Sequence, residues 1–226
     1  MGSFIHVVKR GARGTNIVRD VDDKNRFLLM LAHLNDQYQP NNWFRDIRDN
    51  KHSMFDRPSE WPRQKKIVHI LAFCLLNNHF HLLLEEIEEG GISRFMQRTG
   101  TAMANHFNEK YEEQGSLFQG AYRSRTISRD SYLRYVLAYI QLKNAFDALR
   151  LAPSARAHDF DLLYEKASLY PYSSLGDHLS IVNRPVIERN LLLEFMPAKE
   201  FRTFSRDFVE GRVRIPEEEH EAVYLE

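Results

Sequence analysis

The chain has only one cysteine and no long apolar run, and both features limit the cellular compartments that we expect for it. Cys74 cannot form an internal disulfide, which is typical of proteins kept in a reducing compartment. No apolar stretch approaches the roughly 20 residues needed to cross a bilayer, and Met1–Arg10 lacks the apolar core of a secretory signal. We therefore expect a cytoplasmic protein without membrane insertion.

The chain also lacks net charge, with 31 basic and 31 acidic residues, but the two signs are unevenly distributed. Residues 1–150 carry 22 Lys and Arg against 17 Asp and Glu, whereas residues 151–226 carry 9 against 14. A basic half attracts phosphate groups, so the charge permits nucleic-acid binding without demonstrating it. The length of 226 residues fits one α/β domain over 1–150 and an extension over 151–226 with short helices and an acidic tail.

Hydrophobic periodicity over the first 150 residues predicts the element order β-α-β-β-α-β-α. The predicted strands are 4–9, 66–76, 80–86 and 117–128, and the predicted helices are 22–38, 92–113, 130–149, 186–196 and 198–209. Prolines interrupt residues 39–64, which we interpret as an insertion. The simplest fold is α+β, a ferredoxin-like four-stranded antiparallel sheet with helices on one face.

His79 and His81 flank Phe80 at the start of a predicted strand. Because successive strand residues face opposite ways, both imidazoles project from one face. Histidine is the commonest transition-metal ligand, so the pair indicates a divalent ion, Mg²⁺ or Mn²⁺, completed by water and phosphate. Such a pair also arises by chance in a chain with ten histidines.

Three tyrosines, Tyr132, Tyr135 and Tyr139, lie beside the apolar stripe of the predicted helix 130–149. A phenol, with an ordinary pKa of about 10, is a poor nucleophile unless its target phosphate is polarised, as a bound metal can do. The alternative is that the tyrosines rim the core with their hydroxyls in water. We expect that of Tyr132 and Tyr135.

Arginines and aromatic residues are mixed in the segment 116–125, which is typical of a surface that binds single-stranded nucleic acid. Arg123 and Arg125 belong to it, and Arg10 and Arg13 at the first predicted turn are further candidates for phosphate contacts. Exposed arginines at a sheet edge also serve merely to keep a surface soluble.

Six stretches, taken in order, resemble the REP-associated and insertion-sequence transposases that share the single-tyrosine HUH domain. They are Val8–Gly11, Leu75–Glu85, Ser93–Arg98, Leu117–Gly120, Tyr139–Asn144 and Tyr170–Ser174. The resemblance implies that His79 and His81 bind the metal and that Tyr139 is the nucleophile. It implies a nuclease that cuts and rejoins single-stranded or hairpin DNA through a 5′-phosphotyrosine, with Arg98 among the DNA contacts.

The chain departs from this family near the predicted active site. The family often has a proline where this chain has Asn77, and it often ends the tyrosine motif in Asn-Pro where this chain has Lys143-Asn144. A frequent third metal ligand lies one helical turn past the tyrosine, and Lys143 at that position cannot ligate while protonated but could meet a phosphate. Glu85, Gln141 and Asn144 are the alternatives for the third ligand.

Two other functions remain open on the sequence alone. One is a domesticated hairpin-binding protein that has lost cleavage, which Lys143 favours and the retained His79, His81 and Tyr139 disfavour. The other is a metal-dependent hydrolase of another substrate, which would need further ligands near His79. The sequence leaves open the target DNA and whether a homodimer forms with the tyrosine acting in its own or its partner's site.

Overall fold

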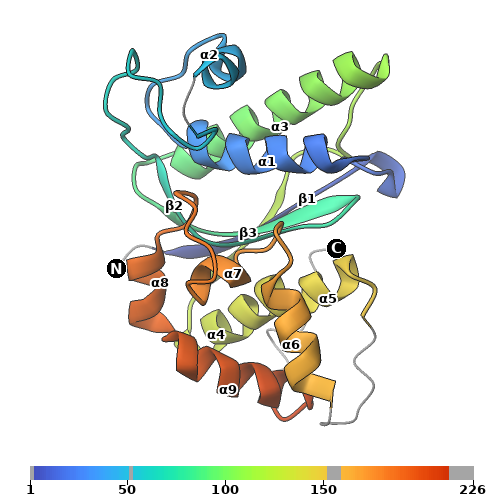
Figure 1. Cartoon of the computed structure of the whole chain (residues 1–226), viewed down its shortest axis with the longest axis vertical. Coiled ribbons are helices and arrows are strands. Elements are labelled where there is room, and N and C mark those ends of the chain that lie inside the picture. Colours follow the sequence, from blue (N-terminus) through green and yellow to red (C-terminus); the bar gives the residue numbers. More distant parts are fainter. Residues whose placement is uncertain (1–2, 51–52, 152–158, 214–226) are drawn as a thin grey trace.

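The computed structural model describes residues 3–50, 53–151 and 159–213, with a four-stranded antiparallel sheet at its centre (Figure 1). The strands are β1 (Phe4–Arg10), β2 (Val68–Leu75), β3 (His79–Glu86) and β4 (Arg123–Ile127). They lie in the order β2-β3-β1-β4, and each neighbouring pair is antiparallel. The predicted α+β class and four-stranded antiparallel sheet are confirmed.

Helices cover both faces of this sheet, whereas the sequence led us to expect them on one (Figure 1). One face carries α1 (Val21–His33) and α3 (Gly91–Tyr111), with α2 (Trp43–Asp49) beyond them. The opposite face carries the helices of the second half of the chain. These are α4 (Asp130–Ala138), α5 (Asn144–Ala148), α6 (Phe160–Ser168), α7 (Leu175–His178), α8 (Arg189–Phe195) and α9 (Ala198–Val209).

The side chains of the two central strands, β1 and β3, explain why helices pack on both faces of the sheet. Phe80 packs against Phe27 of α1 on one face, with ring centroids 5.0 Å apart. Phe4, which points the other way, packs against Phe195 of α8 at 4.9 Å. Residues alternate between faces along a strand, so apolar side chains at consecutive positions require a layer on each side.

Helix α1 ends at His33, earlier than the predicted Tyr38, because Asn35 and Asp36 bind the backbone that leads into β2. The Asn35 carboxamide accepts hydrogen bonds from the Ile67 and Val68 amides and donates one to the Val68 carbonyl. Side chains of this type compete with helix continuation by bonding nearby or returning backbone. The segment 39–64, predicted to be an insertion, contains α2, and its residues 51–52 lie outside the described residues.

Strand β4 begins at Arg123, six residues after the predicted start at Leu117. Leu117 and Gln119 still bond the chain just beyond β1, through Ala12 N to Leu117 O and Gln119 N to Arg10 O. Residues 120–122 then leave the ladder before β4 resumes it. The interruption opens a hollow beside β1 that becomes part of the candidate site.

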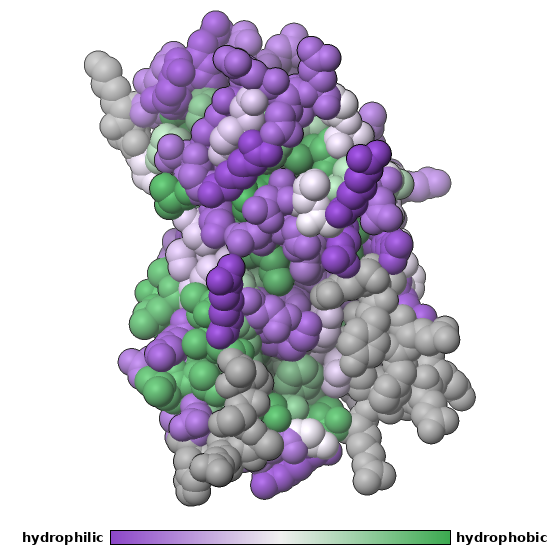
Figure 2. All heavy atoms as spheres, turned by 90° about the vertical axis from the view of Figure 1, so that its right-hand side faces the viewer, coloured by the Kyte–Doolittle hydropathy of each residue, from purple (hydrophilic) through white to green (hydrophobic). Residues whose placement is uncertain are grey.

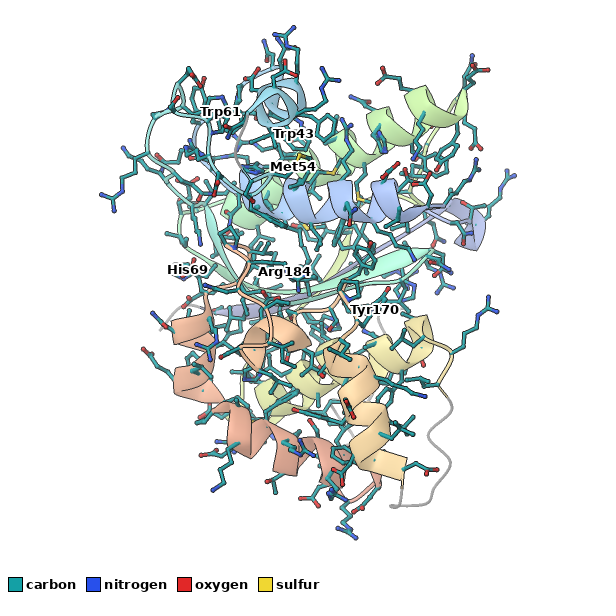
Figure 3. The ribbon with its side chains drawn as sticks, in the orientation of Figure 1. Trp43, Met54, Trp61, His69, Tyr170 and Arg184 are labelled. Atoms are coloured by element: carbon teal, nitrogen blue, oxygen red, sulfur yellow. The ribbon has the colours of Figure 1, made fainter. Side chains whose placement is uncertain are left out.

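The extension attaches to the free edge of β2 through residues 170–174. Leu75 N donates to Tyr172 O, and Ser174 N donates to Phe73 O, so this segment continues the sheet for two bonds. The Tyr170 hydroxyl donates to Leu75 O at 2.8 Å, and Arg184 donates to Ser173 O at 2.9 Å. Figure 3 shows Tyr170 and Arg184 directly beneath the sheet.

The two predicted helices of the extension correspond to α8 and α9, whereas α6 and α7 were not predicted. The predicted acidic tail lies in 214–226, outside the described residues. Within the described ranges, no helix has the length and apolar character needed to cross a membrane. Figure 2 shows hydrophilic side chains over most of the half that contains α1 and α3, and hydrophobic side chains gathering in the other half.

Candidate active site

His79 and His81 lie on the face of the sheet that the second half of the chain covers. His81 is directly opposite Val8 of β1 and Cys74 of β2, and His79 is opposite Arg10. Directly opposed residues of antiparallel strands share a face, so both histidines point away from α1 and α3. Their ring centroids are 4.9 Å apart, which agrees with the strand phase predicted from the sequence.

The hydrogen bond of His79 determines which ring nitrogen has the lone pair. Its Nδ1 lies 2.7 Å from Asn78 Oδ1, and Asn78 Nδ2 donates to Gly14 O, so the carboxamide oxygen faces the imidazole. An amide oxygen only accepts, so the neutral imidazole of His79 has its proton on Nδ1. Its Nε2, which is buried, is then the nitrogen with a lone pair.

A third histidine, His6, lies beside His81 and was not predicted. His6 Nε2 is 3.0 Å from His81 Nδ1, and both side chains are buried. The rings are nearly parallel, with an interplanar angle of 21° and centroids 5.3 Å apart. His6, Val8 and Arg10 alternate with the residues of β1 that face α1 and α3. This alternation along the strand was the feature of the sequence that could have placed His6 on the face of His79 and His81.

Tyr139 contacts this histidine cluster from the helical layer. Its ring lies edge-on to His81 at 5.6 Å and to His6 at 6.2 Å between centroids. The ammonium of Lys143 lies 5.0 Å from the centre of the Tyr139 ring and also pairs with Asp147 at 2.6 Å. Tyr139 is buried, at 2% exposure, whereas the Lys143 side chain that lies over its ring is partly exposed.

Residues Tyr139–Lys143 form a π-helical turn between α4 and α5, whereas the sequence predicted one continuous helix. The Asn144 amide donates to Tyr139 O, five residues back. A π-turn contains one extra residue, so position i+5 as well as i+4 comes close to position i, and such turns are frequent at functional sites. Asn144 is fully buried, and within the described residues its carboxamide has no hydrogen-bond partner.

The extension holds this π-turn by hydrogen bonds to Gln141. Ser173 Oγ donates to the Gln141 carbonyl at 3.0 Å, and the Gln141 side chain contacts Ser174 Oγ and His178 Nδ1 at 3.0 and 2.9 Å. His178 Nε2 lies 2.7 Å from the Met196 carbonyl, which can only accept, so His178 Nε2 is a donor. Gln141 Nε2 thus donates to Ser174 Oγ, and Gln141 Oε1 lies against His178 Nδ1.

Burial lowers the pKa of His178 to about 4, so this imidazole is neutral at physiological pH. The Met196 carbonyl acts in the opposite direction, and the charge of Arg189 adds to the lowering. The extension thus contributes directly to the conformation of the segment that carries Tyr139.

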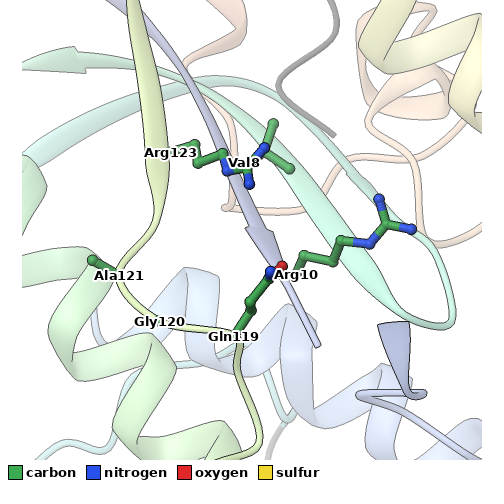
Figure 4. Close-up of a pocket in the computed structure, with 6 residues that line it drawn as sticks. All are labelled: Val8, Arg10, Gln119, Gly120, Ala121 and Arg123. Atoms are coloured by element: carbon green, nitrogen blue, oxygen red, sulfur yellow. The ribbon is translucent and has the colours of Figure 1, made fainter. Parts of the chain in front are cut away.

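A cavity of about 260 Å³ opens beside β1, on the face that carries the histidines. Arg10 and Arg123 line it, together with Val8 and the backbone turn at residues 119–121 (Figure 4). Arg123 is opposite Val8 in the β1–β4 ladder, and Val8 is opposite His81, so the cavity adjoins the histidine row. No acidic residue is among its lining residues, which suits it to an anion such as a phosphate.

Several residues predicted for the site lie elsewhere. Glu85 bonds His69 at 2.9 Å and is four residues beyond His81, about 13 Å along the strand. Arg98 belongs to α3 on the opposite face and donates to the Asp36 carbonyl. Arg13 is exposed in the short turn after β1, and Gln141 is engaged by the extension. Arg125 is on the site face, opposite His6.

The side chains suit a divalent ion held by few protein ligands. His79 and His81 offer ring nitrogens, and the Asn144 carboxamide is buried without a hydrogen-bond partner among the described residues. Among the described residues, no three His, Cys, Asp or Glu side chains are grouped to hold a metal. An ion here would keep open positions for water or phosphate, as Mg²⁺ and Mn²⁺ commonly do.

One family model matches the part of the chain that contains most of this site. Residues 47–143 match the family model described as "Transposase IS200 like". The resemblance to IS200-like transposases is confirmed over this segment. The match runs from within α2 to the end of the π-turn, and it includes His79, His81 and Tyr139, whereas His6 and Asn144 lie outside it. It supports a transposase-like function on DNA.

One solved structure with a similar chain is described as a REP-associated tyrosine transposase bound to a REP hairpin. Its sequence is 12% identical, the alignment covers 79% of each chain, and the TM-score is 0.45. No curated protein sequence matches the chain. The likeness of residues 47–143 to IS200-like transposases therefore rests on the family model.

Proposed function

We propose that the protein is a metal-dependent DNA endonuclease and strand transferase in which Tyr139 attacks a phosphodiester of single-stranded or hairpin DNA. The observation that carries the proposal is the contact of Tyr139 with the His81 ring, 5.6 Å between centroids, inside a segment that matches IS200-like transposases. Because His79 lies beside His81, at 4.9 Å between ring centroids, a phenol in contact with His81 could act on a phosphate bound at both histidines.

In the proposed cleavage step, Tyr139 Oη forms a bond to phosphorus while the bond from phosphorus to O3′ breaks. The phenol gives up its proton and O3′ takes one up, which leaves a 5′-phosphotyrosine and a 3′-hydroxyl. Attack by a 3′-hydroxyl of another strand reverses the step and joins DNA. The two directions together support excision and insertion without a nucleotide cofactor.

His79, His81 and Asn144 are the residues that would hold a divalent metal, Mg²⁺ or Mn²⁺. When bound, the ion supplies the positive charge that polarises the scissile phosphate. Two hydrogen bonds would orient these groups: Asn78 Oδ1 accepts from the His79 ring, and the Asn144 backbone amide donates to the Tyr139 carbonyl in the π-turn. Lys143, whose ammonium lies over the Tyr139 ring, would meet the incoming phosphate.

The DNA partner would approach from the cavity side of the sheet. Arg10 and Arg123 line that cavity, and Arg125 follows along β4, so three cations lie on the site face. Arg98 on the opposite face is not part of this surface. Cytoplasmic localisation and a homodimer remain predictions from the sequence.

The test is denaturing electrophoresis of the protein with Mn²⁺ and a labelled single-stranded hairpin DNA from its own genomic neighbourhood. We expect a covalent protein–DNA band that is lost in Tyr139→Phe and in His79→Ala. Tyr135→Phe is the matched control, because Tyr135 precedes Tyr139 by one turn and its ring packs against that of Phe208. Its band should persist at the level of the unmodified protein.

The competing function is a hairpin-binding protein without cleavage, and the same gel distinguishes it. Tight, salt-sensitive hairpin binding with no covalent band at any Mn²⁺ concentration would contradict the nuclease and support the binding protein. Restoration of the band by Lys143→Gln would then identify Lys143 as the change that ended cleavage, because that substitution removes the cation from the position one turn past Tyr139.

A further inference from the structure

The hydrogen bond between His6 and His81 joins two strands in the covered face of the sheet. Val8, not His6, is the residue directly opposite His81, so the two histidines are diagonal neighbours across β1 and β3. His6 Nε2 and His81 Nδ1 are nevertheless 3.0 Å apart with nearly parallel rings. Both side chains are fully buried, at 0% exposure. Such a contact fixes the orientation of each ring.

One proton lies between these two nitrogens. Which ring carries it determines whether His81 Nε2 has a lone pair. If His81 Nδ1 donates, the neutral ring carries its lone pair on Nε2. If His6 Nε2 donates, His81 Nδ1 is the acceptor and His81 Nε2 carries the proton. A protonated ring nitrogen has no lone pair for a cation, so only the first arrangement leaves His81 Nε2 able to ligate.

We propose that His6 is a positioning residue that accepts the Nδ1 proton of His81 and so presents His81 Nε2 as a ligand. The inference rests on the proposed function, in which His79 and His81 hold a divalent metal. His79 offers the parallel case, because its Nδ1 proton is donated to Asn78 Oδ1. The two strand histidines then have the same tautomer, each set by a neighbour that only has to accept.

The surroundings of His6 favour a positioning role over direct binding of a metal. Its Nε2 is already engaged by His81, and its own ring lies farther from Tyr139 than the His81 ring does, at 6.2 against 5.6 Å. Outer hydrogen-bond partners of metal-bound histidines fix ring orientation and raise ligand basicity, and their loss typically weakens metal binding 10- to 100-fold. We expect an effect of that size for His6.

The first test reads the tautomer without metal or DNA. The full chain labelled with ¹⁵N-histidine is studied by long-range ¹H–¹⁵N correlation at a pH where the imidazoles are neutral. We expect His81 with its proton on Nδ1 in the wild type and in His6→Gln, whose amide oxygen can also accept. The preference should be lost in His6→Leu. A wild-type His81 with its proton on Nε2 would overturn the proposal.

The second test measures Mn²⁺ affinity by electron paramagnetic resonance of the free ion. His6→Leu should bind roughly 10- to 100-fold more weakly, and His6→Gln should recover most of the loss. His69→Leu is the matched control, because His69 is a histidine of β2 whose partner is Glu85, and its affinity should be unchanged. Equal affinity in His6→Leu and wild type would contradict the proposal.

The two tests separate failure of this inference from failure of the proposed function. Mn²⁺ binding and covalent cleavage that are indifferent to His6→Leu would overturn the role of His6 alone. A wild-type chain with the expected His81 tautomer that binds no Mn²⁺ would instead overturn the metal site and with it the role of His6 toward a metal. If His6→Leu does not fold, the wild-type tautomer and the His6→Gln affinity still decide.

Discussion

Protonation of His178 should destabilise the protein in acid by a predictable amount. His178 is fully buried, with one ring nitrogen on Gln141, the other on the Met196 carbonyl, and its ring 4.7 Å from that of Phe201. Burial lowers its pKa from 6.5 to about 4. Each tenfold change in proton affinity is worth about 1.4 kcal/mol, so protonating the folded protein costs about 3 kcal/mol more than protonating the unfolded chain.

The sign follows from which state binds the proton. Between about pH 6.5 and about pH 4 the unfolded chain takes up a proton at His178 and the folded protein does not, so unfolding is favoured as the pH falls. The contribution is fully present above pH 6.5 and is lost progressively down to pH 4. The positive charge of Arg189 also lowers the pKa of His178.

Urea unfolding at a series of pH values between 7 and 4 measures this effect, with His178→Gln as the comparison. The pKa values of His33 and His106 are also lowered by burial, but those residues are present in both proteins and their contributions cancel in the difference. We expect the free energy of unfolding of the wild type to fall by about 3 kcal/mol more than that of His178→Gln across the window. Parallel pH curves for the two proteins would refute the reasoning.

Three further predictions concern the site and its surroundings. Arg10→Ala should weaken hairpin binding and reduce the slope of log affinity against log salt by about 1, whereas Arg98→Ala on the opposite face should leave that slope unchanged in filter-binding titrations. Asn144→Leu should bind Mn²⁺ more weakly yet leave the metal-free protein at least as stable in urea, because it removes a buried amide without a described partner; lower stability would contradict this. Cys74 should resist an aromatic disulfide reagent in the folded protein and react only after unfolding, because burial raises the pKa of its thiol.

The central part of the fold could be predicted because its signals are local. Alternation in β1 and β3 and the Asn77-Asn78 connection predicted the antiparallel sheet, and strand phase placed His79 and His81 on one face. The helical pattern after Asp130 likewise placed Tyr139 on a helix that packs against the sheet. These features depend on neighbours within a few residues.

The features that were missed depend on contacts distant in sequence. The π-turn at Tyr139 is held by Ser173 and His178, more than thirty residues later, so periodicity alone predicted one straight helix. The same layer buries Tyr132, which we expected to have its hydroxyl in water. His6 has no motif of its own, and its role emerges only from the pairing of β1 with β3.

The measurement that tests the central claim most directly is mass spectrometry of the covalent product formed with Mn²⁺ and hairpin DNA. After nuclease and trypsin digestion, the peptide Tyr135–Lys143 contains both Tyr135 and Tyr139, and its fragments separate the two. We predict a nucleotide attached through a 5′-phosphate to Tyr139. Attachment to Tyr135 or to a residue outside this peptide, or no adduct in a preparation that binds the hairpin, would contradict the account.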